Sequence, residues 1–509
     1  SINLNIDSLD VVSKGLSFEA EKATTMKIVS VQKDSVFKAN DNNMKALQNL
    51  DITTAGRFDF TGDSEKLESL STINLKGTSE KSSATVVAGT ALSIQDINLT
   101  ADHLQATMEK QGYQSLNATL NTQGTINAFL NNNTQGEVKF DIEHAGSVNI
   151  VNNSVNIQKF ILVGGVNIET LVKDSFVIKG GTAHQTVLGN IYADKMNVDF
   201  GQTLGLTDLQ GILAANDITL KISQITGANG NIQVAMAGAR NFKADIEGSV
   251  KGDKLDISYS NHATLNTVEN IKVSGDLGAG YDIYSLNTAN TTNTVRTIDL
   301  SGLKNVEKGT ITLDNSNTNL LSLKATGGDD KVTLIDNMLT NNVANNVDID
   351  LGAGDDEIIT KTLVANKTVT INGGAGNDLF DVRASKTDVD ASKYIVVGDA
   401  SGGDKIKFNA LDQSSGFERV EDSVVKDATT LKEAINLAIA SNQSASPILN
   451  KVFYFTYAGD TYVVHNATST AVGTPDTLTA ADTVVKLAGV RSDDLILTAD
   501  YTEGTLNIN

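Results

Sequence analysis

The chain has 509 residues, of which 61 are acidic and 40 basic, for a net charge of −21. This charge argues against nucleic acid or an anionic membrane surface as a partner and favours cations. The absence of cysteine excludes disulfides and thiolate metal sites. No apolar run approaches the roughly 18 residues that span a bilayer, and the N-terminal SINLNIDSLDVV has no features of a cleavable export signal, so we expect no membrane insertion.

Short segments rich in Val, Ile, Thr and Asn recur through the first part of the chain, separated by Gly, Asn, Asp and Ser. Segments such as STINLKG, ATVVAG and KFILVGGVNI are typical of β-strands. We therefore predict a β-rich, solenoid-like region over residues 1–225. Short helices are expected only near 64–70 and 207–216.

Proline is absent from residues 1–446, and the two prolines of the chain are Pro447 and Pro475. Because proline removes a backbone donor from a strand ladder, its exclusion favours long stacks of strands without free edges. Compositional drift is the alternative explanation. With the strand pattern, this predicts an all-β fold, a parallel β-helix or β-roll solenoid.

A glycine-rich pattern repeats between about residues 226 and 425. Five segments share one frame, and their aligned aspartates are Asp282, Asp330, Asp356, Asp378 and Asp404. The first two are 48 residues apart, and the following steps are 26, 22 and 26 residues. Steps of this size suit one coil of a β-solenoid each, and the double first step predicts a degenerate coil within it.

The glycines of the repeat indicate cation binding. Glycine tolerates positive φ and close backbone approach, so a G-G-x-G turn can curl until its carbonyl oxygens converge. Calcium accepts six to eight oxygen ligands at about 2.3–2.6 Å, and an aspartate just after the turn supplies the balancing charge. The apolar residue two positions later is expected to point into the core, so that ion binding and packing use opposite faces of the strand. These apolar residues are Tyr284, Val332, Ile358, Phe380 and Ile406.

The segment GGAGNDLFD, residues 373–381, matches the nonapeptide G-G-x-G-x-D-x-U-x of RTX proteins at every defined position, and the region resembles that family. Two segments carry Leu277 and Leu351 in place of the first glycine, and two keep only the fourth-position glycine and the aspartate. The spacing of more than twenty residues departs from the tandem nine-residue rhythm and suggests calcium along one edge of the roll. Plain turns are the alternative reading.

The resemblance implies which residues hold calcium. They are Gly278, Gly280, Asp282, Gly328, Asp330, Gly352, Gly354, Asp356, Gly374, Gly376, Asp378, Gly402 and Asp404. Three further aspartates precede their turns and are either additional carboxylate ligands or solvated turn residues. These are Asp276, Asp350 and Asp399.

The composition changes near residue 425, and residues 426–509 predict a small α+β domain. DATTLKEAINLAIASN, residues 427–442, is apolar on one helical face, and Thr430 with Glu433 forms a capping box. KVFYFTYAGDTYVVHN predicts two strands joined by a tight turn at Gly459 and Asp460. This segment resembles the domain that follows RTX repeats in type I secreted bacterial proteins, where it carries the export address. A cap that closes the solenoid is the alternative, and both can hold.

No enzyme is expected, because neither H-E-x-x-H nor G-x-S-x-G occurs and the five histidines are scattered singly. The β-coils, the Asn and Thr content and the RTX-like tail resemble type I secreted bacterial surface-layer proteins. This resemblance implies an extracellular protein with Ca²⁺ as its cofactor. Its partners would be further copies of itself in a lattice, the type I secretion apparatus, and a cell-surface polysaccharide or lipopolysaccharide. A calcium-dependent adhesin that binds a glycan is the alternative, and a hydrolase or epimerase with a β-helix groove is a third option.

Overall fold

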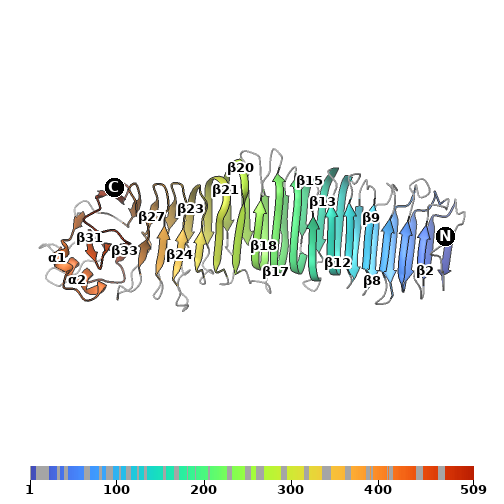
Figure 1. Cartoon of the computed structure of the whole chain (residues 1–509), viewed down its shortest axis with the longest axis horizontal. Coiled ribbons are helices and arrows are strands. Elements are labelled where there is room, and N and C mark those ends of the chain that lie inside the picture. Colours follow the sequence, from blue (N-terminus) through green and yellow to red (C-terminus); the bar gives the residue numbers. More distant parts are fainter. Residues whose placement is uncertain are drawn as a thin grey trace. The chain divides into compact units, whose positions relative to one another are not determined.

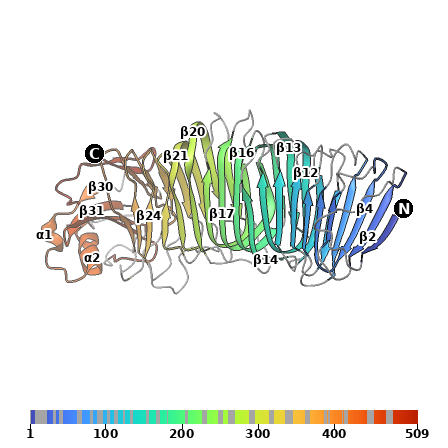
Figure 2. The ribbon, with the colours of Figure 1, turned by 45° about the vertical axis from the view of Figure 1, so that its right-hand side comes forward.

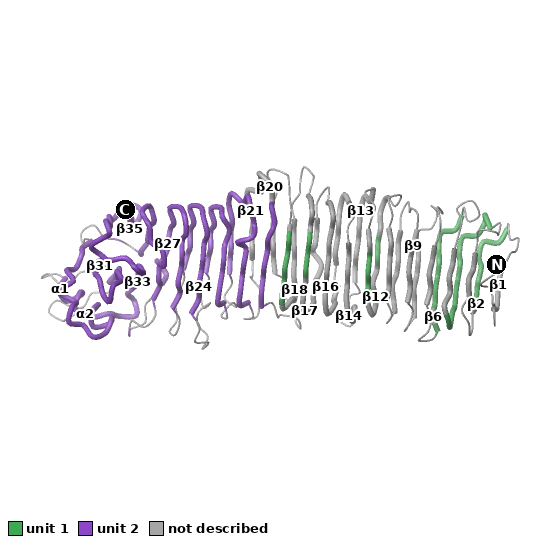
Figure 3. Tube along the Cα trace, in the orientation of Figure 1, with its two compact units in different colours: residues 1–265 green, residues 266–509 purple. Residues whose placement is uncertain are grey.

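A computed structural model of the chain forms two compact units, residues 1–265 and residues 266–509 (Figure 3). The structure describes residues 2–6, 22–30, 35–38, 44–61, 69–78, 83–87, 96–101, 105–110, 116–122, 125–130, 135–152, 156–164, 171–179, 182–189, 191–203, 207–225, 232–246, 254–259, 269–287, 295–313, 320–334, 346–360, 368–385, 390, 394–409, 411, 417–442, 451–467 and 476–509. Nearly all described elements are β-strands, which confirms the predicted all-β solenoid class. Among the described residues, no helix has the length and apolar composition needed to cross a bilayer.

The first unit begins with two rows of parallel strands that stack coil upon coil (Figures 1 and 2). One row contains β1 (Ile2–Ile6), β2 (Thr25–Ser30), β4 (Asn49–Thr54), β6 (Thr72–Gly77), β8 (Asp96–Ala101) and β10 (Leu116–Thr122). The other contains β3 (Ser35–Lys38), β5 (Arg57–Thr61), β7 (Ser83–Val87), β9 (Gln105–Lys110) and β11 (Thr125–Leu130). Both rows pair in parallel with β12 (Gln135–Asn152).

Longer strands complete this unit. They are β13 (Asn156–Gly164), β14 (Leu171–Lys179), β15 (Thr182–Gly189), β16 (Ile191–Thr203), β17 (Thr207–Ile225), β18 (Ile232–Ile246) and β19 (Lys254–Tyr259). The helix predicted over 207–216 is wrong, because this segment lies in β17 and pairs in parallel with β16 and β18. A ladder on both sides satisfies its backbone groups and overrides the weak local helical pattern. The helix predicted near 64–70 lies almost wholly outside the described residues.

The second unit starts with β20 (Asn270–Asn287) and β21 (Thr297–Leu313) and continues as two rows of short parallel strands. The first row is β22 (Ser322–Lys324), β24 (Val347–Asp350), β26 (Val369–Asn372) and β28 (Ile395–Val397). The second row is β23 (Asp329–Leu334), β25 (Glu357–Ile359), β27 (Leu379–Asp381) and β29 (Lys405–Lys407). Strand β21 pairs with β20, with β22 and with β23, so it is the coil predicted between Asp282 and Asp330.

The C-terminal segment covers the last coil of these rows (Figures 1 and 2). It contains β30 (Phe417–Arg419), α1 (Asp422–Val425), α2 (Leu431–Ser441), β31 (Lys451–Tyr457), β32 (Asp460–Asn466), β33 (Thr483–Leu487), β34 (Leu497–Asp500) and β35 (Thr505–Ile508). Strand β33 continues the first row in parallel, and β35 ends the second row with an antiparallel pairing. The segment thus continues both rows beyond their last coil.

Helix α2 has the predicted amphipathic face, with Ala434, Ile435, Ala438 and Ile439 buried. The Thr430 side chain caps it by accepting a hydrogen bond from the Glu433 amide at 3.2 Å. The Glu433 carboxylate accepts a hydrogen bond from the amide of Thr429, whereas a standard capping box would use the amide of Thr430. The N-terminal boundary of the helix therefore follows the capping signal.

The hairpin turn between β31 and β32 differs from the prediction by one residue. Its two central residues are Ala458 and Gly459, with φ of 51° and 92°, and Asp460 already pairs with Tyr457. Two left-handed residues are the signature of a type I′ turn, whose twist matches that of the flanking strands.

Glycines permit the close stacking of the corners between the two rows of the second unit. A Cβ atom on Gly374 would lie 1.7 Å from the carbonyl oxygen of Gly352, and one on Gly376 would lie 1.9 Å from that of Gly354. Their φ values of 94° and 147° also lie in the region that favours glycine. The backbone of one coil therefore rests directly on the backbone of the coil before it.

We expect Gly374→Ala to destabilise the second unit, because it adds backbone strain on the order of 1–3 kcal/mol to a steric clash. Gly327→Ala is the matched control, since no heavy atom lies within 4 Å of its added methyl group. Urea unfolding of both full-length variants measures the difference. Equal losses of stability would show that the corner does not require glycine at position 374.

Candidate metal centre

Four of the five aligned aspartates form a column inside the corners of the second unit. Asp330, Asp356, Asp378 and Asp404 are only 1–2% exposed, and each lies directly before or within the first residues of its strand in the second row. The parallel register of β23, β25, β27 and β29 places each of them next to its equivalent in the neighbouring coil. We call these four residues the aspartate column.

One oxygen of each later column residue has a structural role. The Oδ1 atom of Asp356 accepts a hydrogen bond from the Asp330 amide at 2.7 Å. Asp378 does the same for Asp356 at 2.9 Å, and Asp404 for Asp378 at 3.0 Å. Corner amides lie where the strand ladder is interrupted and need another acceptor, which the next coil provides. The aspartate repeat is therefore partly explained without any ion.

A second, exposed row of side chains caps further corner amides in the opposite direction. Asp329 Oδ1 accepts from the Asp355 amide at 2.9 Å, and Asp355 Oδ1 accepts from the Asn377 amide at 2.8 Å. We did not predict this row from the sequence. Its signal is the polar residue that precedes the column aspartate in GGDD, AGDD and AGND.

The second carboxylate oxygen distinguishes the corners from one another. In the first corner, Asp330 Oδ2 accepts from the Thr326 amide at 2.6 Å and from its hydroxyl at 2.9 Å. In the last corner, Asp404 Oδ2 accepts from the Ser401 amide at 2.7 Å and from its hydroxyl at 3.3 Å. Both carboxylates are satisfied on this side by their own turns.

The two central corners lack such donors. The Oδ2 atoms of Asp356 and Asp378 are buried and have no hydrogen-bond partner among the described residues. A buried carboxylate normally has compensation of some kind, as Asp381 shows by pairing with the Arg383 guanidinium at 2.5 Å. Within the described part of the chain, no ion pair involves Asp356 or Asp378.

The electrostatics of the two central carboxylates reflect this arrangement. Burial raises the pKa of Asp356 to about 8, the hydrogen bond from the Asp330 amide opposes the shift, and the neighbouring acids Asp330 and Asp378 add to it. Burial also raises the pKa of Asp378 to about 6, with Asp404 among the acids that reinforce the change. These carboxylates therefore become anionic at neutral pH only at a cost, which a bound cation would offset.

The prediction that the apolar residue two positions after the aspartate points into the core is confirmed for Val332, Ile358, Phe380 and Ile406, which are fully buried. The predicted separation of the aspartates and these packing residues onto opposite faces is wrong. Asp330 and Val332 are both buried, and β23 alternates so that Asp329 and Lys331 face solvent. Residues two positions apart lie on the same face of a strand, so the column and the apolar core share one interior.

Other predicted ligands lie apart from the column. Ile283 pairs with Lys308, and Lys308 pairs with Asp329, so Asp282 lies two positions out of register with Asp330. The side chains of residues 277–282, which include Gly278 and Gly280, lie outside the described part. Asp276 is exposed and accepts a hydrogen bond from the Asn305 amide group at 2.6 Å.

The aspartates that precede the later turns differ in their contacts. Asp399 accepts hydrogen bonds from the amides of Gly373 and Gly374 at 2.9 and 2.8 Å, so both of its oxygens cap a neighbouring turn. Asp350 ends β24 and is exposed. The contacts of Asp399 therefore direct its carboxylate to the turn of the neighbouring coil and not to the column.

The predicted glycines also differ in what they contribute. A Cβ on Gly328 would lie 2.2 Å from the Val306 carbonyl oxygen, so this position requires glycine. Gly402 has ample space, and the constrained position is its neighbour Gly403, with φ of 106° and a Cβ site 2.0 Å from Asn377 Oδ1. The motif alignment pointed to Gly402, but the last corner reaches its aspartate by a different turn, in which Gly403 takes the constrained position.

The donor set of the central corners fits calcium. The described residues contain no group of three or more Asp, Glu or His side chains arranged to hold a metal. An ion there would instead be held by the free oxygens of Asp356 and Asp378 together with main-chain carbonyls. Hard oxygen ligands with a carboxylate charge are what calcium prefers, and it tolerates irregular geometry.

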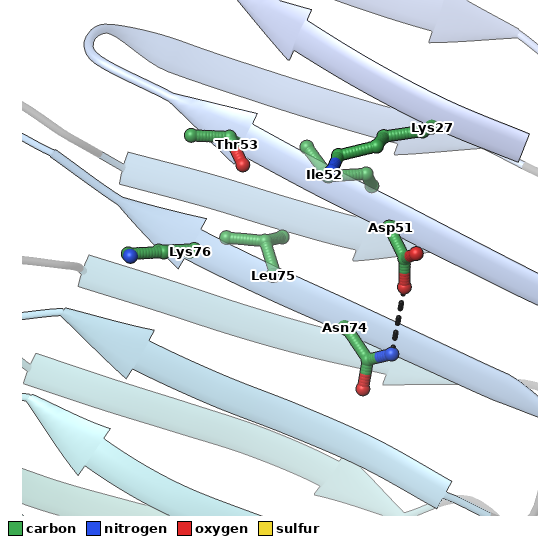
Figure 4. Close-up of a pocket in the computed structure, with 7 residues that line it drawn as sticks. All are labelled: Lys27, Asp51, Ile52, Thr53, Asn74, Leu75 and Lys76. Atoms are coloured by element: carbon green, nitrogen blue, oxygen red, sulfur yellow. Dashed lines mark hydrogen bonds between the residues drawn. The ribbon is translucent and has the colours of Figure 1, made fainter. Parts of the chain in front are cut away.

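An open groove of about 410 Å³ crosses the outer face of β2, β4 and β6 in the first unit (Figure 4). Its lining includes Lys27, Asp51, Thr53, Asn74 and Lys76. The Asp51 carboxylate accepts a hydrogen bond from Asn74 at 2.7 Å, and the groove brings no pair of acids together. It offers no chemistry comparable to that of the aspartate column.

Comparison with known proteins does not identify a family for this chain. A scan of protein-family models finds no match to the chain. A search of curated proteins also finds no significant match.

We expect the ion-free protein to lose stability as the pH rises from about 4 to about 8. The folded-state pKa values of Asp356 and Asp378 lie above the ordinary value of an aspartate, so the folded state holds protons that the unfolded chain releases in this range. Each group contributes at most about 1.4 kcal/mol per pH unit. Asp356→Asn mimics the protonated form and should therefore gain stability over wild type as the pH rises.

Far-ultraviolet circular dichroism in chelator between pH 5 and pH 8 measures this effect as the pH at which the strand signal of the second unit is lost. Asp356→Asn should keep the signal to a higher pH than wild type, and Asp378→Asn should show a smaller version of this shift, because its pKa is raised less. Loss of the signal at the same pH in Asp356→Asn and in wild type would contradict the electrostatic account.

Proposed function

We propose that this protein is a structural component of a bacterial surface layer. It is exported by a type I system, folds as calcium binds in its glycine corners, and assembles with copies of itself into a two-dimensional lattice on the cell surface. We assign no catalytic residue to it. A cell-surface polysaccharide or lipopolysaccharide is the proposed anchoring partner.

The observation that carries this proposal is the pair of buried carboxylate oxygens in the central corners. Asp356 and Asp378 lie next to each other in the column, and each has one oxygen without a hydrogen-bond partner in the described structure. Two neighbouring acids in a dry interior without a basic partner destabilise the fold unless a cation or protons neutralise them. In the resembled family, such corners hold calcium.

The spacing of the coils favours calcium over magnesium. Equivalent atoms in successive coils of a parallel sheet are about 4.8 Å apart. This is close to twice the calcium–oxygen distance of about 2.4 Å and exceeds twice the magnesium–oxygen distance of about 2.1 Å. Magnesium also demands near-ideal octahedral geometry, which stacked backbone corners do not offer.

Calcium binding would couple export to folding. With a net charge of −21, the chain repels itself when no cation is bound, and this disfavours the compact state. Calcium-poor cytosol would keep the chain open for secretion, and the higher calcium concentration outside the cell would drive it to fold. A solenoid that becomes rigid only outside the cell suits a mechanical role.

Chelation should therefore remove β-structure from the second unit. We expect the far-ultraviolet circular dichroism of the full chain to lose strand signal in excess chelator and to recover it when calcium is added. Magnesium at equal concentration is the control and should not restore the signal. A spectrum that is insensitive to chelator would count against calcium-coupled folding.

Negative-stain microscopy of the full-length protein tests the lattice. Ordered two-dimensional arrays should form in millimolar calcium chloride and disperse in chelator. Isolated particles that bind bacterial or host cells in a calcium-dependent way would instead support the adhesin. Particles that neither assemble nor bind cells would contradict both functions.

A further inference from the structure

The aspartate column contains two kinds of corner, although all four share the same aspartate. On the Oδ2 side, the first and last corners are closed from within, because Thr326 and Ser401 each donate an amide and a hydroxyl to the Oδ2 atom of their own aspartate. These carboxylates accept from the donors of their own turns, and burial leaves them no further access to solvent.

The residue four positions before the aspartate differs between the closed first corner and the two central ones. Thr326 lies four residues before Asp330, and the residues four positions before Asp356 and Asp378 are Gly352 and Gly374. A glycine there removes the hydroxyl donor. It also adopts positive φ, 107° at Gly352 and 94° at Gly374, a conformation that L side chains rarely adopt.

In the Asp378 corner, the backbone donor is redirected as well. In the first corner the Thr326 amide points to Asp330, whereas the Gly374 amide donates to Asp399 Oδ2 in the following coil at 2.8 Å. Asp399 thereby removes the amide that would have closed the Asp378 corner. The free Oδ2 of Asp378 instead lies over Gly373, where an added Cβ would come within 2.1 Å of it.

On the basis of the calcium binding proposed above, we infer that the column holds its ion only in the central corners, between Asp356 and Asp378. Thr326 and Ser401 act as built-in substitutes for the ion in the two flanking corners. The two carboxylates of one central pair supply a charge that matches one divalent cation. The flanking corners are then preformed ends that hold the central coils in register before calcium arrives.

Calcium titration of the full chain tests this division. Asp356→Asn and Asp378→Asn can keep the Oδ1 acceptor for the neighbouring amide, while they remove the charge and replace the free Oδ2 with an NH2 group. Each should weaken calcium binding at this site at least tenfold. Asp404→Asn is the matched control in a closed corner, and its calcium affinity should stay within about threefold of wild type, a difference of about 0.7 kcal/mol.

Native mass spectrometry in calcium chloride gives an independent readout. Wild type should carry one more calcium ion than the double variant Asp356→Asn/Asp378→Asn, whatever other sites the chain contains. Circular dichroism confirms that each variant is folded. If Asp404→Asn destabilises its corner, Ser401→Ala removes a closing donor while preserving the carboxylate, and it should leave the count unchanged.

The outcomes separate this inference from the proposed function. A wild-type chain that binds no calcium overturns both. Three other outcomes overturn the two-corner assignment alone. In the first, the double variant binds as many calcium ions as wild type. In the other two, Asp404→Asn loses calcium equally, or the double variant loses more than one ion. Loss of one ion only through Asp356 and Asp378 supports it.

Discussion

The hydrogen bond from a corner amide to the carboxylate of the next coil is the contact on which the second unit depends. At each corner the chain leaves one row of strands and enters the other, and its amides lose their ladder partners. The Oδ1 atoms of Asp356, Asp378 and Asp404 take over as acceptors, each for the coil before its own. Each coil therefore caps its neighbour, and the spacing of the aspartates must equal the length of a coil.

This solution creates an electrostatic cost. A carboxylate that caps an amide in the interior brings a second oxygen and a negative charge with it, and the column repeats both at every coil. The flanking corners offset the cost with Thr326 and Ser401, whose amides and hydroxyls occupy the second oxygen. The central corners do not, and burial raises the pKa values of Asp356 and Asp378 accordingly. A cation is the simplest remaining compensation, which links the fold to the proposed calcium dependence.

Close stacking of the corners explains why the same positions combine glycine with aspartate. Gly374 and Gly376 rest against the carbonyl oxygens of Gly352 and Gly354, so no side chain fits between the coils. The aspartate that follows is then held against bare backbone. The proposed role in a surface layer would need rigid, repeating units. An ion that locks two such coils would supply rigidity where no side chains lie between them.

The sequence alone determined the solenoid class, the length of each coil and the position of helix α2. These follow from local and repeated signals: alternating apolar residues, aspartates 26, 22 and 26 residues apart, and the Thr430 cap. Only the tertiary structure decided which oxygen of each aspartate is used, that Asp282 is out of register, and that residues 207–216 form a strand. Those outcomes depend on which backbone group of the neighbouring coil faces each residue. Motif spacing carries no information about that contact. The difference between Thr326 and Gly352 is visible in the sequence, but its effect on the aspartate oxygen appears only when the coils are stacked.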